Sequence, residues 1–252
     1  MLRSAVERFS RGKLIRRRLP RRFNHVPLYV SPDSQLKYMK PGEAAFDLEL
    51  LKVVETFISD TSIVWDIGAN VGVFSFAAAG VAKNGSVLAV EADIWLAQIV
   101  RKSLLLNENK NLNVDVLPCA IANEDGVATF LIAQRGRASN SLESIGGHSQ
   151  TGGVRERVSV PTLTLDTLLN HFKAPTFLKV DVEGAETMVL QGATRLLRDI
   201  RPMIYIEVGD EENAEVTKIL TESNYRLYDI SKDIVSQTPM EKCLFNTLAI
   251  PY

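Results

Sequence analysis

The sequence Val64-Trp65-Asp66-Ile67-Gly68-Ala69-Asn70-Val71-Gly72 decides the fold class of this 252-residue chain. Its first residues continue a short apolar run that begins at Ser62 and is typical of a buried strand. The glycines allow a tight turn and the close approach of a helix, which the apolar stretch 70–82 predicts. Glu91 ends the next predicted strand, where its carboxylate can accept hydrogen bonds from both hydroxyls of a ribose. This order of elements indicates a site for a cofactor that contains a nucleoside.

Two features of the turn argue against a cofactor that carries phosphate. Asn70 stands where a dinucleotide-binding turn has a bare glycine, so its side chain would crowd a pyrophosphate. Asp66 adds negative charge just before the turn, and the sequence contains no P-loop pattern. A cationic ligand without phosphate fits better, and we predict S-adenosylmethionine. A plain strand–turn–helix connection without a ligand is the alternative.

Predicted strands and helices alternate along the chain from residue 43 onward. The strands are expected at 62–67, 86–91, 113–117, 177–181 and 203–208, and the helices at 43–59, 70–82, 93–106, 183–198 and 211–223. Two last strands, at 225–230 and 244–250, are expected to close the sheet as an antiparallel pair. This alternation predicts an α/β fold with a mostly parallel sheet and helices on both faces.

The alternation breaks in the middle of the chain, where two further strands are expected at 128–133 and 157–163. They bracket a Gly-rich excursion, 134–157, which is long for a connection inside one domain. We interpret the excursion as a segment on the carboxyl edge of the sheet and as a candidate lid.

Charge divides the chain into two parts. Residues 1–25 contain nine Arg or Lys and one acid, whereas the other 227 residues contain 20 bases and 29 acids. Pro27, Pro32, Pro41 and Gly42 follow the basic stretch, and a helical pattern begins at Glu43, so we divide the chain into a basic N-terminal arm, 1–42, and a main domain, 43–252. The body is too acidic to be a general polyanion binder. We expect residues 1–25 to contribute nothing to the core; the arm is either a solvated extension or a segment that steers an anionic acceptor or contacts an anionic membrane surface.

Composition restricts the class of protein further. Apolar residues make up 46% of the chain, which is enough for a sizeable core. The sequence has no apolar run long enough to span a membrane. Two cysteines without metal-ligand spacing indicate a reducing compartment, and we expect a cytoplasmic location.

Several segments together resemble class I methyltransferases and, more narrowly, the FkbM-type methyltransferase family. The segments are Asp66–Gly72, Ala89-Val90-Glu91-Ala92, Thr164-Leu165-Asp166, Leu178-Lys179-Val180-Asp181-Val182-Glu183-Gly184-Ala185-Glu186, Leu190-Gln191-Gly192-Ala193 and Arg201-Pro202-Met203-Ile204-Tyr205-Ile206-Glu207, with a looser match at Phe46-Asp47-Leu48-Glu49. The segment that starts at Lys179 is the specific part. The resemblance covers residues 43–250 and implies a Rossmann-like sheet of seven strands, S-adenosylmethionine as methyl donor, and most often O-methylation of small molecules or sugars.

These patterns assign the donor site. We predict that the cofactor-binding residues are Asp66, Gly68, Ala69, Asn70, Gly72, Glu91, Ala92, Ala120 and Asp181.

The catalytic candidates are Asp181, Glu183 and Glu207, because the fourth and fifth strands should end at the same edge of the sheet. Close carboxylates raise one another's pKa, so one of them can act as a general base near neutral pH. They could instead hold a divalent cation, although we assign no metal ligand. In another interpretation, Glu183 and Glu186 are only first-turn acids that the helix dipole favours. Lys179, if buried, needs a carboxylate partner.

The fourth predicted strand and the excursion bear on the class of methyl acceptor. The fourth strand lacks the proline-rich and aromatic turn that holds a flipped base, which argues against nucleic acid. Ser139, Asn140 and His148, all in the excursion, are candidate substrate-binding residues, with turn formers and a solvated histidine as the alternatives. Two other functions stay open: a methyltransferase that reaches a glycan chain or nucleic acid through the basic arm, and a non-catalytic protein that binds S-adenosylmethionine.

Overall fold

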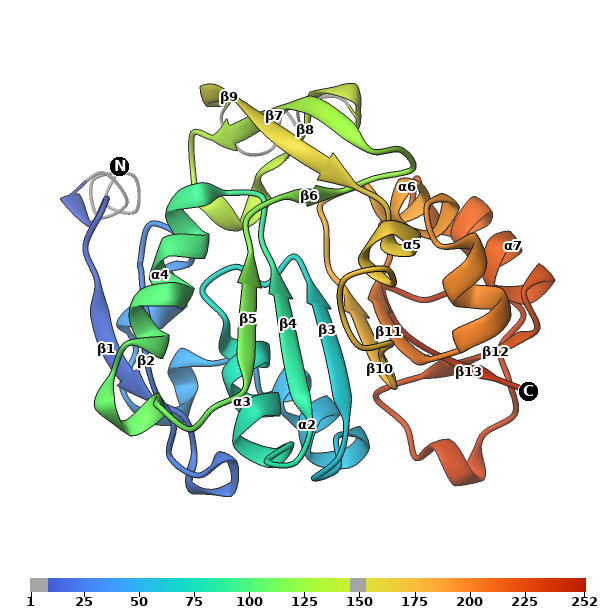
Figure 1. Cartoon of the computed structure of the whole chain (residues 1–252), viewed down its shortest axis with the longest axis horizontal. Helices are drawn as coiled ribbons and strands as arrows, with labels where there is room; N and C mark the ends of the chain where they lie inside the picture. The colour runs from blue at the N-terminus through green and yellow to red at the C-terminus, as the bar shows by residue number, and fades with distance from the viewer. Residues whose placement is uncertain (1–8, 146–152) are drawn as a thin grey trace.

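A central sheet runs through the computed structural model, which describes residues 9–145 and 153–252 (Figure 1). Within these residues the sheet has seven strands, in the order β12 (Tyr225–Asp229), β13 (Asn246–Pro251), β11 (Met203–Glu207), β10 (Phe177–Val180), β3 (Ile63–Ile67), β4 (Ser86–Val90) and β5 (Val114–Leu117). β13 is antiparallel to both neighbours, and the other adjacent strands are parallel. The predicted sheet, with its antiparallel last strand, is confirmed.

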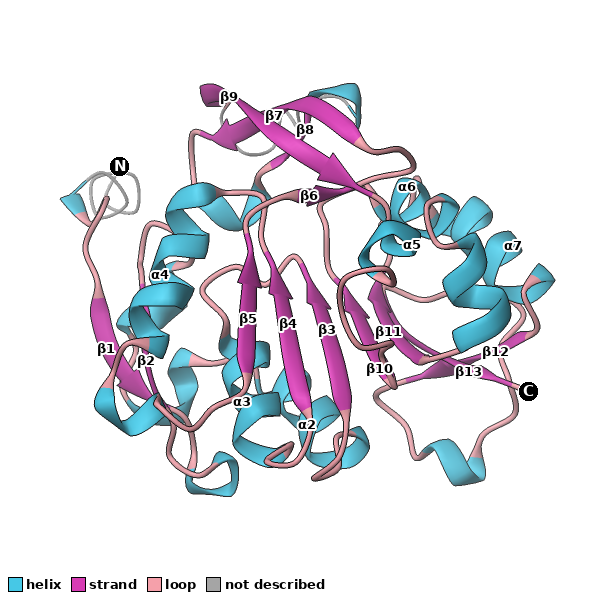
Figure 2. Ribbon diagram, viewed as in Figure 1, coloured by secondary structure: helices cyan, strands magenta, loops and turns pink. Residues whose placement is uncertain are grey.

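Helices cover both faces of this sheet (Figure 2). On one face lie α2 (Leu48–Phe57), α3 (Val73–Val81) and α4 (Ile94–Leu104), and on the other lie α5 (Leu165–Leu168), α6 (Glu186–Gln191) and α7 (Asn213–Glu222). Successive strand residues face opposite layers: Val64 packs with the first group of helices and Trp65 with the second. Burial on both faces explains why the strands are continuous apolar runs rather than alternating ones.

Two predicted helices differ from the observed ones. The helix expected at 43–59 begins only at Leu48, because Asp47 caps it by accepting hydrogen bonds from two backbone N–H groups, and a 3₁₀ turn (Gly42–Ala45) precedes it. The helix expected at 183–198 is divided into α6 and a π-helical turn, Leu196–Ile200.

The division of the second helix has a packing reason. Gly192 ends α6 where a Cβ atom would lie 2.3 Å from the carbonyl oxygen of Ala122, so the chain can pass only without a side chain. The carboxylate of Asp166 then accepts hydrogen bonds from the backbone N–H groups of Arg195 and Leu196 and starts the next turn.

A second, smaller sheet lies across the carboxyl ends of β3, β4 and β5, at the top of Figure 1. In the part of the chain that the structure describes, its order is β6 (Ala120–Ile121), β9 (Val154–Leu163), β7 (Gly126–Ala133) and β8 (Ser141–Leu142). β7 and β9 pair in antiparallel fashion along almost their whole length. The two strands expected in the middle of the chain are therefore present, and Arg137 and Asn140, which lie between them, are at the edge where a ligand would bind.

The N-terminal segment packs on the outside of α4. Its hairpin consists of β1 (Ile15–Arg18) and β2 (Pro27–Val30), and the backbone N–H of Tyr29 donates a 2.8 Å hydrogen bond to Ser103 of α4. Leu19 and Phe23 are fully buried in the same apolar cluster as α3. The expectation that residues 1–25 contribute nothing to the core is therefore wrong for the described residues 9–25.

This error has a physical cause. Leu19 directly follows the four-residue strand β1 and Phe23 ends a 3₁₀ turn, each with an arginine before it, so no helical or long strand period appears in the sequence. In residues 9–145 and 153–252, no helix combines the length and the apolar character that a membrane crossing requires.

Candidate functional site

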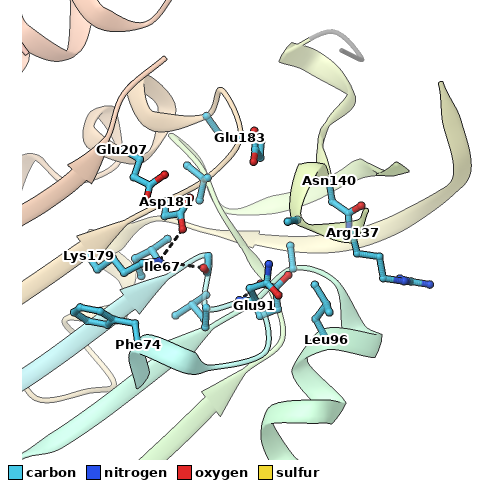
Figure 3. Close-up of a pocket in the computed structure, with 18 of the residues that line it drawn as sticks. Ile67, Phe74, Glu91, Leu96, Arg137, Asn140, Lys179, Asp181, Glu183 and Glu207 are labelled. Carbon is cyan, nitrogen blue, oxygen red and sulfur yellow. Dashed lines mark hydrogen bonds and ion pairs between the residues drawn. The ribbon is translucent and has the colours of Figure 1, made fainter. Parts of the chain in front are cut away.

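A pocket lies where the carboxyl ends of β3, β4 and β10 meet two irregular segments, 35–50 and 137–142 (Figure 3). It contains about 1230 Å³ of space free of protein atoms, part of which is open to solvent. Its wall includes these predicted site residues: Gly68, Ala69, Asn70, Glu91, Ala92, Ala120, Asn140, Asp181, Glu183 and Glu207.

The glycine turn forms the floor of the pocket. Gly68 has a φ of +78°, and a Cβ atom there would lie 1.9 Å from the carbonyl oxygen of Asp181. The backbone N–H groups of Gly68 and Ala69 both donate to the carbonyl oxygen of Val90, at 3.0 and 2.9 Å. Glycine is therefore required at position 68 because the turn lies against the end of β10. Gly72 begins α3 and does not line the pocket.

Glu91 follows β4 and turns its carboxylate toward the pocket. One oxygen accepts a 2.7 Å hydrogen bond from the N–H of Asn70, and the other accepts a 2.8 Å bond from the N–H of Asp93. Burial raises the pKa of Glu91 to about 7, and the two N–H donors oppose that rise. Ala92 and Ala120 line the pocket beside it, as predicted for a donor site.

A buried ion pair supports the turn from below. The ammonium group of Lys179 lies 3.0 Å from Asp66 and 3.2 Å from Asp181, and it donates to the carbonyl oxygen of Gly68 at 3.2 Å. Burial by itself lowers the pKa of Lys179, but the charges of Asp181 and Asp66 raise it above its usual range. The expected carboxylate partner of a buried lysine is thus present.

Asp66 does not line the pocket, contrary to its predicted role. It lies inside β3, is fully buried, and accepts a hydrogen bond from Ser75 of α3. A residue inside a strand faces the layer packed on the sheet, whereas the residues after the strand end face the pocket. Asp66 can therefore act on a ligand only through Lys179.

The three predicted catalytic carboxylates lie together at the other end of the pocket. Figure 3 shows Asp181, Glu183 and Glu207 on one side of Glu91, with Arg137 and Asn140 on its other side. Burial and the negative charge of Asp181 raise the pKa of Glu183 and that of Glu207 to about 7 each. Near neutral pH both groups therefore exist as a mixture of protonated and ionised forms.

Two neighbours of this cluster have structural roles. The hydroxyl of Tyr205 lies 3.3 Å from a carboxylate oxygen of Glu207 and 2.9 Å from the side-chain oxygen of Asn246. Glu186 is buried outside the pocket wall, where it accepts a hydrogen bond from the N–H of Gly184 at the start of α6. The interpretation of Glu186 as a first-turn acid is therefore favoured.

The predicted substrate-binding residues have different positions. Asn140 lines the pocket, but its side chain donates to Asp93 at 2.8 Å and accepts from the N–H of Ala133, which places it at the Glu91 end. Ser139 does not line the pocket, and His148 lies outside the described residues. Asn140 is thus beside the predicted donor residues rather than beside the catalytic carboxylates.

The sequence did not single out several residues of the wall as site residues. These are Gln35, Lys37, Tyr38, Leu50 and Arg137, and Asp47 joins them from the segment that only loosely matched the family. Leu50 lies in α2, and the others lie in or near short 3₁₀ turns, which have no periodic signal. Within residues 9–145 and 153–252 there is no group of three or more His, Cys, Asp or Glu side chains suited to hold a metal ion.

The strand order and the pocket together define the class of protein. Seven strands in this order, with one antiparallel strand, form the class I methyltransferase fold. The chain belongs to the FkbM methyltransferase family, because the model of the methyltransferase FkbM domain matches residues 66–227.

Solved structures of other methyltransferases are similar to this chain. The methyltransferase FkbM from Methylobacillus flagellatus KT is 19% identical with a TM-score of 0.48, over 76% of this chain and 44% of that one, so the chain spans less than half of that protein. The precorrin-6y C5,15-methyltransferase from Geobacter metallireducens GS-15 is 13% identical, with a TM-score of 0.46 and coverage of 86% and 90%. The M. jannaschii TYW2 structure in complex with AdoMet is 13% identical, with a TM-score of 0.45 and coverage of 89% and 80%. A search of curated proteins found no match.

Proposed function

We propose that this protein is an S-adenosylmethionine-dependent O-methyltransferase that acts on a hydroxyl group of a small molecule or sugar. Membership of the FkbM methyltransferase family supports methyl transfer from S-adenosylmethionine. The observation that carries the proposal is a pocket with Glu91 at one end, three carboxylates at the other, and the glycine turn in the floor between them. Glu91 can bind the nucleoside of the donor, and the three carboxylates can accept the proton that an acceptor hydroxyl loses.

The wall of the pocket fits the donor chemically. The backbone of Gly68–Asn70, the carboxylate of Glu91, Ala92 and Ala120 are the residues that would hold it. Glu91 keeps its carboxylate on the pocket while two backbone N–H groups fix its orientation, which suits the hydroxyls of a ribose. Bound S-adenosylmethionine supplies a methyl group that its positive sulfonium has already activated.

The carboxylates at the other end supply the proton acceptor. An alcohol loses its proton as it gains the methyl group, and a carboxylate with a pKa of about 7 can accept that proton at neutral pH. Glu183 and Glu207 both have this property. Asp181 pairs with the ammonium group of Lys179, which orients its carboxylate. We therefore assign Asp181 to alignment of the acceptor hydroxyl.

Charge at this end favours an uncharged acceptor. Asp47, Asp181, Glu183 and Glu207 line it, whereas Lys37 and Lys179 each have a carboxylate partner within 3.4 Å. A phosphate or carboxylate on the acceptor would meet uncompensated negative charge. Hydroxyl groups of a sugar can instead donate hydrogen bonds to these oxygens.

The macromolecular alternative loses support from the N-terminal segment. Arg16 and Arg18 both pair with Glu108, and Arg22 pairs with Glu43. Arg17 donates two hydrogen bonds to the carbonyl oxygen of Tyr38, which lines the pocket. Arg17 thus supports the pocket wall, and the contacts of these arginines within the protein account for part of the basic residues 1–25 without an anionic partner.

The experiment that tests the proposal follows a labelled methyl group from S-adenosylmethionine into a panel of neutral sugars and hydroxylated metabolites. We expect transfer to at least one acceptor, and a loss of more than about 100-fold in Asp181→Asn and in the double variant Glu183→Gln/Glu207→Gln. Glu143→Gln, an exposed carboxylate outside the pocket, is the matched control. Transfer to nitrogen or carbon only would overturn O-methylation, and donor binding without transfer to any acceptor would favour the non-catalytic alternative.

A further inference from the structure

A closed circuit of hydrogen bonds and ion pairs surrounds the Glu91 end of the pocket. It joins three segments that are far apart in the sequence, 33–34, 70–93 and 137–140. The contacts run from Glu91 through Asn70 to Ser34, continue along the chain to its neighbour Asp33, and return through Arg137 and Asp93 to Glu91. Because its contacts have no periodic spacing, they could not be predicted from the sequence.

The first half of the circuit fixes the glycine turn to the N-terminal segment. The N–H of Asn70 donates to Glu91 at 2.7 Å, and the hydroxyl of Ser34 donates to the side-chain oxygen of Asn70 at 2.6 Å. Asn70 has a φ of +54°, a conformation that a side-chain hydrogen bond helps to hold. Ser34 is buried, so this contact is shielded from water.

The second half is ionic and has Arg137 at its centre. The guanidinium of Arg137 lies 3.4 Å from the carboxylate of Asp33 and also pairs with Asp93, while its backbone N–H donates to the carbonyl oxygen of Asp33. Arg155 lies 3.2 Å from both carboxylate oxygens of Asp33. Asp93 closes the circuit, because its N–H donates to Glu91 at 2.8 Å.

Burial makes this network different from the ion pairs on the surface. The side chains of Arg137, Asp33 and Asp93 are 10%, 6% and 3% exposed, so solvent screens their charges little. The guanidinium of Arg137 also lies 4.7 Å from the ring centre of Trp95 at the start of α4. Arg137 is thus held by the carboxylate of Asp33 in the N-terminal segment and by Asp93 and the ring of Trp95 at the start of α4.

We propose that Arg137 is a positioning residue for the methyl donor, and this inference rests on the proposed function. It holds Ala138, Asn140 and Leu142, which line the pocket, over the residues that would bind the nucleoside. Residues 137–142 of the excursion therefore close over the donor, and the N-terminal segment at Asp33 is the anchor of that closure. This assignment differs from the role in acceptor binding that the sequence predicted for Asn140.

The test compares donor binding in Arg137→Ala, Arg137→Lys and Asp33→Asn with that of the unmodified protein. Arg157→Ala is the matched control, because it removes an exposed ion pair of the same excursion outside the pocket. The readouts are the Kd of S-adenosylmethionine and S-adenosylhomocysteine by calorimetry, their release rates by stopped flow, and the thermal transition of the free protein. Release rates separate closure over the ligand from stability, because a purely structural role would lower only the transition temperature.

We expect Arg137→Ala to weaken donor binding at least tenfold, mainly through faster release, and Arg137→Lys to recover part of the loss. Asp33→Asn, which keeps the shape of a side chain outside the pocket wall, should change release in the same direction even if Arg137→Ala fails to fold. Unchanged Kd and release rates in folded Asp33→Asn and Arg137→Lys would overturn the inference. An unmodified protein that binds neither compound would overturn the donor assignment as well, so the two failures are distinguishable.

Discussion

The pocket has two walls that are built by different means. The strand wall consists of residues at the ends of β3, β4 and β10, namely Gly68–Asn70, Glu91 and Asp181. The loop wall consists of residues 35–47 and 137–142, which form short 3₁₀ turns, and the ion pair of Asp33 with Arg137 ties it to the N-terminal segment. Backbone hydrogen bonds of the sheet fix the first wall, whereas ion pairs and the buried N-terminal hairpin fix the second. Substitutions in the strand wall should therefore abolish donor binding or folding. Substitutions in the loop wall should lower donor affinity or stability by smaller amounts.

The largest effect is expected at the glycine turn of the strand wall. Gly68→Ala would place a Cβ atom 1.9 Å from the carbonyl oxygen of Asp181, so β3 and β10 must separate. We expect a loss of about 4 kcal/mol or more in the free energy of unfolding, and no donor binding by calorimetry. The control is Gly12→Ala, which shares a positive φ but has open space around it and should cost about 1–2 kcal/mol. Equal losses in the two variants would contradict the role of this close approach.

The next largest effect on stability is expected in the N-terminal segment, which supports the loop wall. Phe23 is 1% exposed and packs beside α3, so Phe23→Ala should lower the free energy of unfolding by about 3–5 kcal/mol. Phe9→Ala, at a position that is 77% exposed, should change it by less than about 0.5 kcal/mol. Chemical denaturation measures both, and similar midpoints would mean that the N-terminal segment does not belong to the core.

The same comparison explains which residues could be predicted from the sequence. Gly68, Glu91 and Asp181 follow buried strands, and the carboxyl ends of parallel strands meet at one edge, so order along the chain predicts their place in space. Arg137 and Asp33 are neighbours only because the chain folds back over the sheet, and nothing in their spacing indicates the contact. Position relative to a strand end also explains the error at Asp66, which lies inside β3 and faces α3.

Stability should depend on pH through the buried carboxyl groups. Burial raises the pKa of Glu186 to about 8, whereas in the unfolded chain the group ionises near its usual value of about 4.3. Between these values the folded state binds the proton more tightly, so stability is fully present at low pH and falls as pH rises toward 8. Glu186→Gln should therefore be more stable than the unmodified protein at pH 8, by about 1–3 kcal/mol, and similar to it at pH 4. Urea unfolding at the two pH values checks the sign, and a greater stability of the unmodified protein at pH 8 would contradict it.

The smallest effect is expected at Tyr205. Its hydroxyl lies near Glu207, and this contact lowers the pKa of Glu207 against the larger effect of burial. Tyr205→Phe should therefore shift the rise of methyl transfer with pH to a slightly higher pH and reduce the rate at pH 7 by about two- to fivefold. Tyr225→Phe is the control, because the hydroxyl of Tyr225 has no hydrogen-bond partner among the described residues. A pH profile that is identical in Tyr205→Phe and the unmodified protein would remove Glu207 from the candidates for the base.

The central claim is that the strand wall is a donor site with Glu91 as its ribose ligand. Calorimetric titration with S-adenosylmethionine of the unmodified protein, Glu91→Ala and the exposed control Glu108→Ala tests it most directly. We predict one site per chain, a loss of about 10- to 100-fold in affinity for Glu91→Ala, and no change for Glu108→Ala. Absence of binding to the unmodified protein, or equal affinity in Glu91→Ala, would contradict the account.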